Sequence, residues 1–335
     1  MAGGLTVDQR VATTPVKLLP VPDVSVCVCT FRRPALLKQL LQSLAEQTFP
    51  ISRLECVVVD NDEAGSAQET VTRFGREHPE LTIRYAHELT PGVSHARNRA
   101  VAQARAERIA FVDDDEIADR DWLSQLNAAM DRYEADVVQG PTRVHLDLTH
   151  PDWVRRVNAR SHLDHVVSGL DVPRGAGGTG NVLFRRQALG ERAHRPFDPL
   201  FARTGGEDTD LFDWILNRGG RIAWCAEART LEHLSPERLR LRFYVQRALR
   251  VSAVHWRGVY RCSNPVRVAV YALAGVSVSL ICGLSSLLAW PAGRTRAVPL
   301  LLVAMRAAGR VLALTRIELA GYGDNNASKS RREVT

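Results

Sequence analysis

The sequence predicts an α/β fold in which helices flank a mainly parallel sheet, followed by a C-terminal membrane-associated helical region. Short apolar runs typical of buried strands alternate with amphipathic helical stretches, and short connections join them. Three of these runs end in polar or acidic residues, which is where ligands bind in open α/β sheets. Residues 268–289 carry no charge over 22 positions, a length that can cross the roughly 30 Å hydrocarbon layer of a membrane.

Composition and charge narrow the class of protein. The chain of 335 residues is 45% hydrophobic and 24% charged, which is the make-up of a globular protein rather than a disordered one. Its net charge of +7 is unevenly spread, because residues 236–335 contain 16 Lys and Arg against 4 Asp and Glu, whereas the rest contains 28 against 33. The basic residues alternate with apolar ones, a pattern that favours anionic lipid over nucleic acid as a partner.

The cysteines and the N-terminal segment indicate the compartment. The six Cys residues include no CxxC pair and no metal-binding spacing, so we expect reduced, buried thiols in the cytoplasm. Residues 1–22 lack the apolar core of a secretory signal, and we expect a flexible lead-in there.

The first part of the chain is predicted to alternate strands and helices. We expect strands at 24–30, 54–59, 81–86 and 109–112. One helix is expected to begin at Pro34, which suits a first helical turn, and to end near Gln47. Ser94 is expected to cap the next helix. Short strand–helix–strand units of this kind favour parallel pairing.

Polar side chains follow three of these strands, at the point where each strand ends. Because parallel strands end at one edge of a sheet, we expect these residues to line one crevice. They are Thr30 and Arg32 after the first strand, Asp60 and Asp62 after the second, and Asp113, Asp114 and Asp115 after the fourth. Arg97, in the first turn of the helix after Ser94, is expected to point to the same side. The alternatives are a solvated turn for Asp60 and Asp62 and a plain surface charge for Arg97.

The three consecutive carboxylates at residues 113–115 are the most informative feature. Adjacent negative charges repel one another, so a fold that keeps them together must offset the charge. A hard divalent cation, Mg²⁺ or Mn²⁺, with a phosphate-bearing ligand would do so. The alternative is a solvated acidic turn before the helix that begins near Asp121. No GxGxxG fingerprint follows the first strand, and no P-loop occurs in the sequence.

Two further segments carry candidate site residues. The glycine-rich run 174–181 leads into a short strand at 182–184, and its glycines permit either close approach to a ligand or tight turns. The run GGEDTD places Glu207, Asp208 and Asp210 in the first turn of a helix, where acids also suit the helix dipole. A carboxylate there could act as general base toward an alcohol. His233, after a strand at 222–224, is either an additional metal ligand or a structural residue.

Six segments taken together resemble the family 2 glycosyltransferases with the GT-A fold. They are VCVCTFRRPALLKQLLQSL, VVVDND, GVSHARNRA, FVDDDE, GTGNVLFRR and GGEDTDLF, and they fall in order between residues 24 and 233. The forms CTFRRP, DDDE and GEDTD look closest to the succinoglycan-type glucosyltransferases of bacterial exopolysaccharide biosynthesis. The resemblance implies a GT-A fold and an inverting transfer from a nucleotide sugar, usually UDP-linked, to an acceptor hydroxyl.

The resemblance also implies a role for each matching residue. Asp208 matches the catalytic base, and Asp115 matches the ligand of Mg²⁺ or Mn²⁺, with His233 as an additional candidate. Nucleotide-sugar contacts are implied for Thr30, Arg32, Asp60, Arg97, Asp113 and Asp114, among which Asp60 matches the acid that binds uracil. An acceptor and sugar loop is implied for Gly178, Gly180, Asn181 and Glu207.

One departure concerns processivity. Processive synthases of this family carry a QxxRW signature, and the nearest string here, Gln246-Arg247-Ala248-Leu249-Arg250, does not match it. We therefore expect one sugar to be added per encounter. The expectation that this sugar is glucose comes from the resemblance alone.

The C-terminal part predicts membrane attachment. Residues 239–260 form a basic amphipathic helix, and 268–289 form an apolar stretch. Residues 297–314 are interrupted by Arg306 and Arg310 and suit an interfacial or re-entrant helix. The alternative is a buried helical pair that packs on the catalytic domain. We expect the bacterial inner membrane as location, a cytoplasmic catalytic domain and a lipid-linked saccharide acceptor.

These expectations divide the chain into four segments. They are a lead-in (1–22), a catalytic domain (23–238), membrane-associated helices (239–320) and a polar tail (321–335). Within the catalytic domain, 23–140 would bind the nucleotide sugar and 141–238 the acceptor. The competing hypothesis from another class is a membrane-attached, non-catalytic subunit that binds a nucleotide sugar or a glycan.

Overall fold

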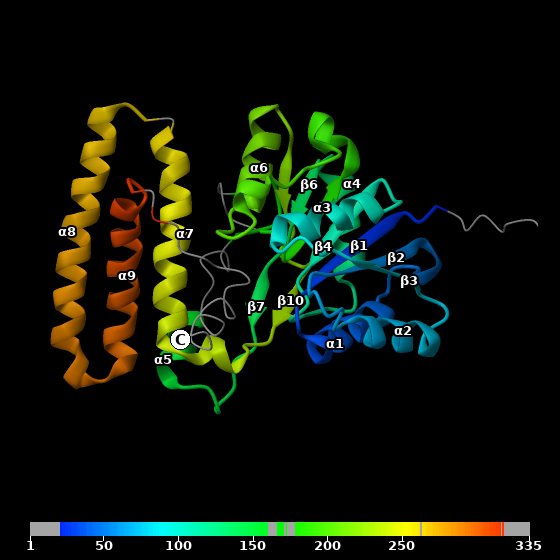
Figure 1. Cartoon of the computed structure of the whole chain (residues 1–335), viewed down its shortest axis with the longest axis horizontal. Helices are drawn as coiled ribbons and strands as arrows, with labels where there is room; N and C mark the ends of the chain where they lie inside the picture. Colours follow the sequence, from blue (N-terminus) through cyan, green and yellow to red (C-terminus); the bar gives the residue numbers. More distant parts are fainter. Residues whose placement is uncertain are drawn as a thin grey trace, which may run out of the picture.

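The main sheet has seven strands in the order β3-β2-β1-β4-β8-β6-β9 (Figure 1). The computed structural model describes residues 21–159, 166–170, 172, 178–261, 263–315 and 317. The strands are β1 (Val24–Thr30), β2 (Leu54–Asp60), β3 (Thr82–His87), β4 (Arg108–Val112), β6 (Val137–Gln139), β8 (Asn181–Arg185) and β9 (Ile222–Trp224). The first four are parallel, β8 is antiparallel to both β4 and β6, and β6 is parallel to β9. The predicted mainly parallel sheet is therefore confirmed.

Helices cover both faces of this sheet because its strands are apolar on both sides. Along β1, Val24, Val26 and Val28 pack on one side, and Cys27 packs on the other. The first side is covered by α1 (Pro34–Ala45), α2 (Gln68–Glu77) and α4 (Trp122–Arg132). The second is covered by α3 (Val93–Gln103) and α6 (Glu207–Asn217). The result is a three-layer sandwich of helices, sheet and helices.

A second, smaller sheet stands beside the end of β4. It consists of β5 (Glu116–Ala118), β10 (Thr230–Glu232) and β7 (Thr142–Val144), in the order β5-β10-β7. Strand β5 follows the three carboxylates directly, and β10 ends just before His233. The small sheet therefore brings the chain after residue 230 back to the acidic edge of the main sheet.

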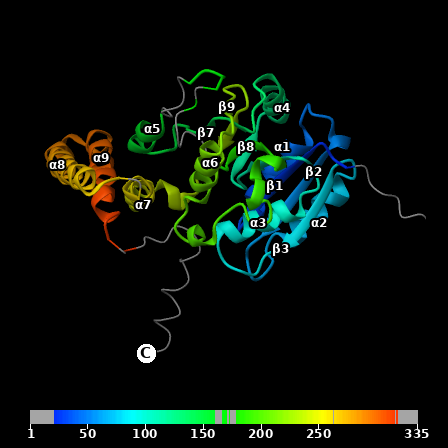
Figure 2. The same cartoon turned by 90° about the horizontal axis from the view of Figure 1, so that it is seen from above.

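The C-terminal helices form a bundle at one side of the α/β part (Figures 1 and 2). Helix α9 (Arg294–Leu312) packs between α7 (Leu241–Arg261) and α8 (Pro265–Ala289), and it also contacts α5 (Asp152–Asn158). A small core joins the two parts through Trp153 and Val154 of α5, Ala248 of α7, and Val298 and Leu302 of α9.

Helix α8 is the outermost element and is long and apolar enough to cross a membrane. Within Pro265–Ala292, which comprises α8 and the turn after it, an 18-residue window has a mean hydropathy of 2.0. Only 6% of this window is buried. The alternative of a buried helical pair is therefore wrong for α8. The buried arrangement describes α9 better, because α9 packs against α5, α7 and α8. Helix α9 does not lie apart from the protein at a membrane interface.

Two local details differ from the sequence-based expectation. Gly92, not Ser94, is the N-cap of α3; Ser94 lies inside the first turn, and its hydroxyl has no hydrogen-bond partner among the described residues. The backbone of Gly92 has a φ of +127°, which a glycine adopts without strain. Helix α2 and the short strands β6, β7 and β10 were not anticipated: α2 buries only Val71 and Phe74, and each of these strands has three residues.

Candidate active site

The carboxyl ends of β1, β2 and β4 meet at one edge, as predicted from parallel pairing. Thr30 lies opposite Asp60 in the register of β1 and β2. The hydroxyl of Thr30 donates a hydrogen bond of 2.7 Å to Asp114, which follows β4. Residues 84 positions apart in sequence are thus joined at the sheet edge.

Two arginines neutralise the carboxylates after β4. Arg33 donates to Asp114 at 3.1 Å and to Asp115 at 2.9 Å. Arg238, from the turn before α7, lies 3.0 Å from the same Asp115 oxygen. Burial raises the pKa of Asp114 to about 6, an effect that the charge of Arg33 partly offsets. Sequence reasoning missed both arginines, because nothing in the local pattern shows that a side chain 123 positions away reaches Asp115.

A buried ion pair links α3 to the first turn of α6. The guanidinium of Arg97 pairs with Glu207 and also lies 3.6 Å from Asp113. Glu207 is only 2% exposed, and one of its carboxylate oxygens has no hydrogen-bond partner in the described part of the chain. Burial raises the pKa of Glu207 to about 7, against the opposing effect of Arg97. Arg97 therefore connects the acids after β4 with the acids of α6.

The glycine-rich loop closes the same region. A Cβ on Gly180 would lie 2.7 Å from Glu116 and 3.1 Å from Asp113, and one on Gly178 would lie 2.8 Å from Asp208. The distances of 2.7 Å to Glu116 and 2.8 Å to Asp208 are shorter than ordinary van der Waals contacts. Glycine at these two positions therefore permits the loop to pass between the acids that follow β4 and the acids of α6. Gly177 and residues 173–176 lie outside the described residues.

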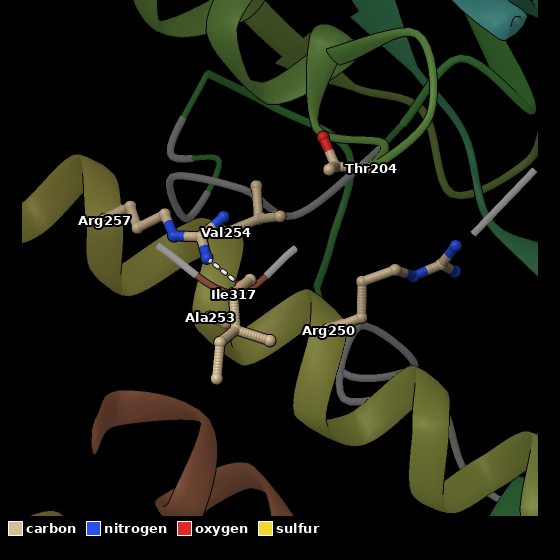
Figure 3. A pocket seen from close by; sticks show the side chains of 6 residues that line it. All are labelled: Thr204, Arg250, Ala253, Val254, Arg257 and Ile317. Atoms are coloured by element: carbon tan, nitrogen blue, oxygen red, sulfur yellow. Dashed lines mark hydrogen bonds between the residues drawn. The ribbon is translucent and has the colours of Figure 1, made fainter. Parts of the chain in front are cut away.

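Asp208 lies in the first turn of α6, beyond a glycine with a left-handed backbone. Gly206 has a φ of +102°, and a Cβ there would lie 2.5 Å from a methyl group of Val254 in α7. Thr204, from the same loop, faces a small pocket that is otherwise lined by Arg250, Ala253, Val254, Arg257 and Ile317 (Figure 3). Arg257 donates to the carbonyl of Ile317 across this pocket. Helix α7 thus packs against the loop that positions Asp208.

Three of the predicted site residues bond to the scaffold. Asp60 is fully buried and accepts hydrogen bonds from the amides of Asp62 and Ala67 and from the hydroxyl of Tyr85. Asn181 accepts from the indole of Trp122 and donates to the carbonyls of Pro141 and Ala228. Arg32 donates to Asp62 at 2.8 Å, and its backbone φ is +56°.

His233 lies beside the acidic edge. Its backbone amide donates to the carbonyl of Asp115 at 3.0 Å, and its ring lies 5.1 Å from that of His145. Burial, and then His145, lower the pKa of His233, which favours the neutral ring that binds metals. Within the described ranges, no group of three His, Cys, Asp or Glu side chains is arranged as a metal site.

Comparisons with known proteins agree with this architecture. Residues 25–192 match the family model described as glycosyl transferase family 2. The chain is 34% identical over 275 residues to the succinoglycan biosynthesis protein ExoM of Rhizobium meliloti (strain 1021), which covers 82% of this chain and 87% of that protein. It is also 32% identical over 114 residues to the poly(ribitol-phosphate) beta-N-acetylglucosaminyltransferase TarS of Staphylococcus aureus (strain Mu50 / ATCC 700699), of which it spans 20%.

A solved structure supports the fold. The mannosyltransferase PcManGT from Pyrobaculum calidifontis, in complex with GDP-Man and Mn²⁺, superposes with a TM-score of 0.60 at 20% identity. The match covers 87% of each chain. At this identity the likeness concerns the fold, which is the GT-A arrangement expected above.

Proposed function

The chain belongs to glycosyl transferase family 2, and from this membership we propose that it moves one sugar from a UDP-sugar to a hydroxyl of a lipid-linked saccharide. The chain is therefore a glycosyltransferase; the donor, the acceptor and the stereochemistry are the proposal. Glucose as the sugar and inversion as the outcome come from the resemblance of the motifs. Assembly of a cell-surface exopolysaccharide is supported by the name of the relative that matches most of the chain.

The convergence of two acidic groups on one glycine-rich loop is the observation that carries the proposal. Asp113 lies on one side of Gly180, and Asp208 lies beside Gly178. Arg97 pairs with Glu207 and lies near Asp113, so it joins the two groups. A transferase needs one acidic group near the donor and another near the acceptor, and these two groups are supplied by the turn after β4 and by the first turn of α6.

Asp208 is proposed to act as the general base. As the acceptor oxygen forms its bond to the anomeric carbon, its proton passes to the Asp208 carboxylate. The bond between that carbon and the diphosphate oxygen breaks, and the electron pair stays on the leaving oxygen. Proton transfer of this kind contributes roughly 10²–10⁴-fold to the rate. Displacement by one attack from the opposite face inverts the anomeric configuration.

A divalent cation is proposed to bind at the carboxylates that follow β4. The buried carboxylate of Asp115 is a hard oxygen ligand, and a backbone hydrogen bond joins Asp115 to His233, whose lowered pKa favours the neutral ring. Asp115 and His233 would hold Mg²⁺ or Mn²⁺, which supplies Lewis-acid stabilisation of the leaving diphosphate when bound. Thr30, Arg32, Asp60, Asp113 and Asp114 are proposed to contact the nucleotide sugar. The Mn²⁺ in the Pyrobaculum neighbour is in keeping with such an ion.

Membrane attachment through α8 is proposed to bring the enzyme to its acceptor. The exposed apolar side chains of α8 would lie in lipid, while the arginines of α7 and the start of α9 would contact anionic head groups. With the catalytic domain in the cytoplasm of a bacterial cell, a lipid-linked acceptor in the inner membrane would be held at high effective concentration.

Transfer of labelled sugar tests the proposal directly. Membranes containing the protein are supplied with UDP-, GDP- or TDP-sugars and with Mn²⁺ or Mg²⁺, and label is measured in organic-extractable lipid. We expect metal-dependent incorporation from one UDP-sugar and a loss of at least about 100-fold in Asp208→Asn. Asp213→Asn, an acid in the second turn of the same helix, is the matched control and should remain active.

The competing binding-subunit hypothesis makes a different prediction. A non-catalytic subunit would bind UDP but show neither incorporation nor slow hydrolysis of any donor. Donor hydrolysis without incorporation would instead point to a missing acceptor. Equal activity of Asp208→Asn and Asp213→Asn would refute the assignment of the base.

A further inference from the structure

Two guanidinium groups lie on one carboxylate oxygen in the candidate active site. Arg33 and Arg238 lie 2.9 and 3.0 Å from the same oxygen of Asp115. The Asp115 side chain is 3% exposed, so this carboxylate is neutralised by protein charges in a largely buried setting. Arg33 belongs to the first loop after β1, whereas Arg238 comes from the other end of the catalytic domain.

A divalent cation on Asp115 would compete with these arginines. A metal ion and a guanidinium that share one carboxylate oxygen repel each other, and the repulsion is strong where water is excluded. Binding of the ion to this oxygen therefore requires at least one guanidinium to leave it. The displaced group needs another anion, and the diphosphate of a nucleotide sugar brings such a group to this edge.

Of the two, Arg33 is also bonded to Asp114, whereas Arg238 reaches Asp115 from a turn. It lies in the short turn Pro236–Leu239, between β10 and α7, and its side chain is 19% exposed. It is anchored to Glu232 by a second ion pair and lies 5.7 Å from the ring of Phe243. Both contacts are made by the guanidinium itself: Nη1 bonds to Glu232 and keeps the head near the site, while Nη2, which bonds to Asp115, can exchange one anion for another.

We propose that Arg238 is a further donor-binding residue that neutralises Asp115 without donor and contacts the diphosphate once metal and donor bind. This inference rests on the proposed glycosyl transfer. When the bond from the anomeric carbon to the diphosphate breaks, the electron pair remains on the leaving oxygen. The Arg238 guanidinium then stabilises that charge by charge-assisted hydrogen bonds, which makes it a catalytic residue.

The proposal predicts opposite effects on two ligands. Arg238→Gln removes one of the two guanidinium groups that compete for Asp115 and leaves Arg33 in place, so Mn²⁺ alone should bind about tenfold more tightly. The same change removes a partner of the diphosphate, so UDP in saturating Mn²⁺ should bind about tenfold more weakly. The value of kcat should fall roughly 10²-fold or more, as for loss of one oxyanion contact.

Both affinities are measured on the full chain in detergent, with Mn²⁺ followed by its paramagnetic resonance signal and UDP by calorimetry. Arg240→Gln, an exposed arginine two positions further on, is the matched control and should change neither affinity. Arg238→Lys keeps a positive charge and should bind Mn²⁺ like wild type while recovering part of the UDP affinity.

The outcomes separate this inference from the proposed function. Parallel weakening of Mn²⁺ and UDP in Arg238→Gln, or no change in either, would overturn the inference even if wild type transfers sugar. Absence of Mn²⁺ binding to Arg238→Gln without nucleotide would also overturn it. Opposite shifts in a protein that neither transfers nor hydrolyses any donor would support the binding role and reject the transferase function.

Discussion

Substituting Gly206 tests whether α7 supports the loop that positions the proposed base. At Gly206→Ala the φ of +102° would cost about 1–2 kcal/mol in an L-residue. The new Cβ would also lie 2.5 Å from a methyl group of Val254, an overlap worth about 1–3 kcal/mol. We expect the free energy of unfolding to fall by roughly 2–5 kcal/mol, and kcat to fall by about 100-fold if Asp208 shifts by about 1 Å.

Gly219→Ala is the matched control at the other end of α6. Its φ is +85°, but no heavy atom lies within 4 Å of the added Cβ. The free energy of unfolding of Gly219→Ala should therefore fall only by the cost of the positive φ, about 1–2 kcal/mol, and activity should be retained. Thermal unfolding in detergent measures the difference, because each kcal/mol shifts the Tm by roughly 2–4 °C in a domain of about 200 residues.

A double substitution isolates the contact between α7 and the loop. Val254→Ala removes the overlapping methyl group, so Gly206→Ala combined with Val254→Ala should be more stable than the sum of the single effects. The coupling should lie within the range of roughly 0.5–3 kcal/mol found for contacting residues. If Gly206→Ala and Gly219→Ala lose equal stability and the double substitution shows no coupling, α7 does not support the loop and the reasoning fails.

Two further predictions concern the buried acid and the apolar helix. Because the pKa of Glu207 is raised to about 7 in the folded protein, its contribution to stability should be fully present below about pH 4.5 and lost as the pH rises through about 7. The Tm of wild type relative to Glu207→Gln should therefore fall between pH 5 and 8. Leu280 is 68% exposed on α8; Leu280→Arg should weaken membrane association by about 2.5–3.5 kcal/mol without changing the Tm in detergent, as followed by flotation.

Each of these two predictions has a result that contradicts it. A constant Tm difference between wild type and Glu207→Gln from pH 5 to 8 would mean that the Glu207 carboxyl does not titrate in this range. Leu148 is 88% exposed outside the helical bundle, so Leu148→Arg should leave flotation unchanged. If Leu280→Arg and Leu148→Arg float alike, α8 is not in contact with lipid.

Local sequence patterns predicted the elements that have strong periodicity or clear ends. The apolar runs around β1, β2 and β4 and the acids that follow them are local features, and parallel pairing then places Thr30 beside Asp114. The 22 uncharged residues at 268–289 predicted α8 within a few positions. Short elements with few apolar positions, such as β7 and α5, were not predicted, because three to seven residues carry little periodic signal.

The cap of α3 shows how tertiary structure overrides a local preference. Ser94 suits an N-cap by residue type. However, the amide of Gly92 donates to Asn61, and a Cβ at Gly92 would lie 2.6 Å from that of Ala202. The close approach of another segment therefore decides where the helix begins, and no residue adjacent in sequence indicates it.

Sequence alone determined the sheet edge, the acidic groups of β4 and α6, and the apolar helix, since strand ends and hydrophobic length are encoded by neighbouring residues. Only the tertiary structure decided which charges meet. Arg238 reaches Asp115, Arg97 reaches Glu207, and Asn181 bonds to Trp122. Such contacts join residues on different elements, whose packing sets their distance, because an arginine or asparagine binds whichever partner the crossing elements place within hydrogen-bonding reach.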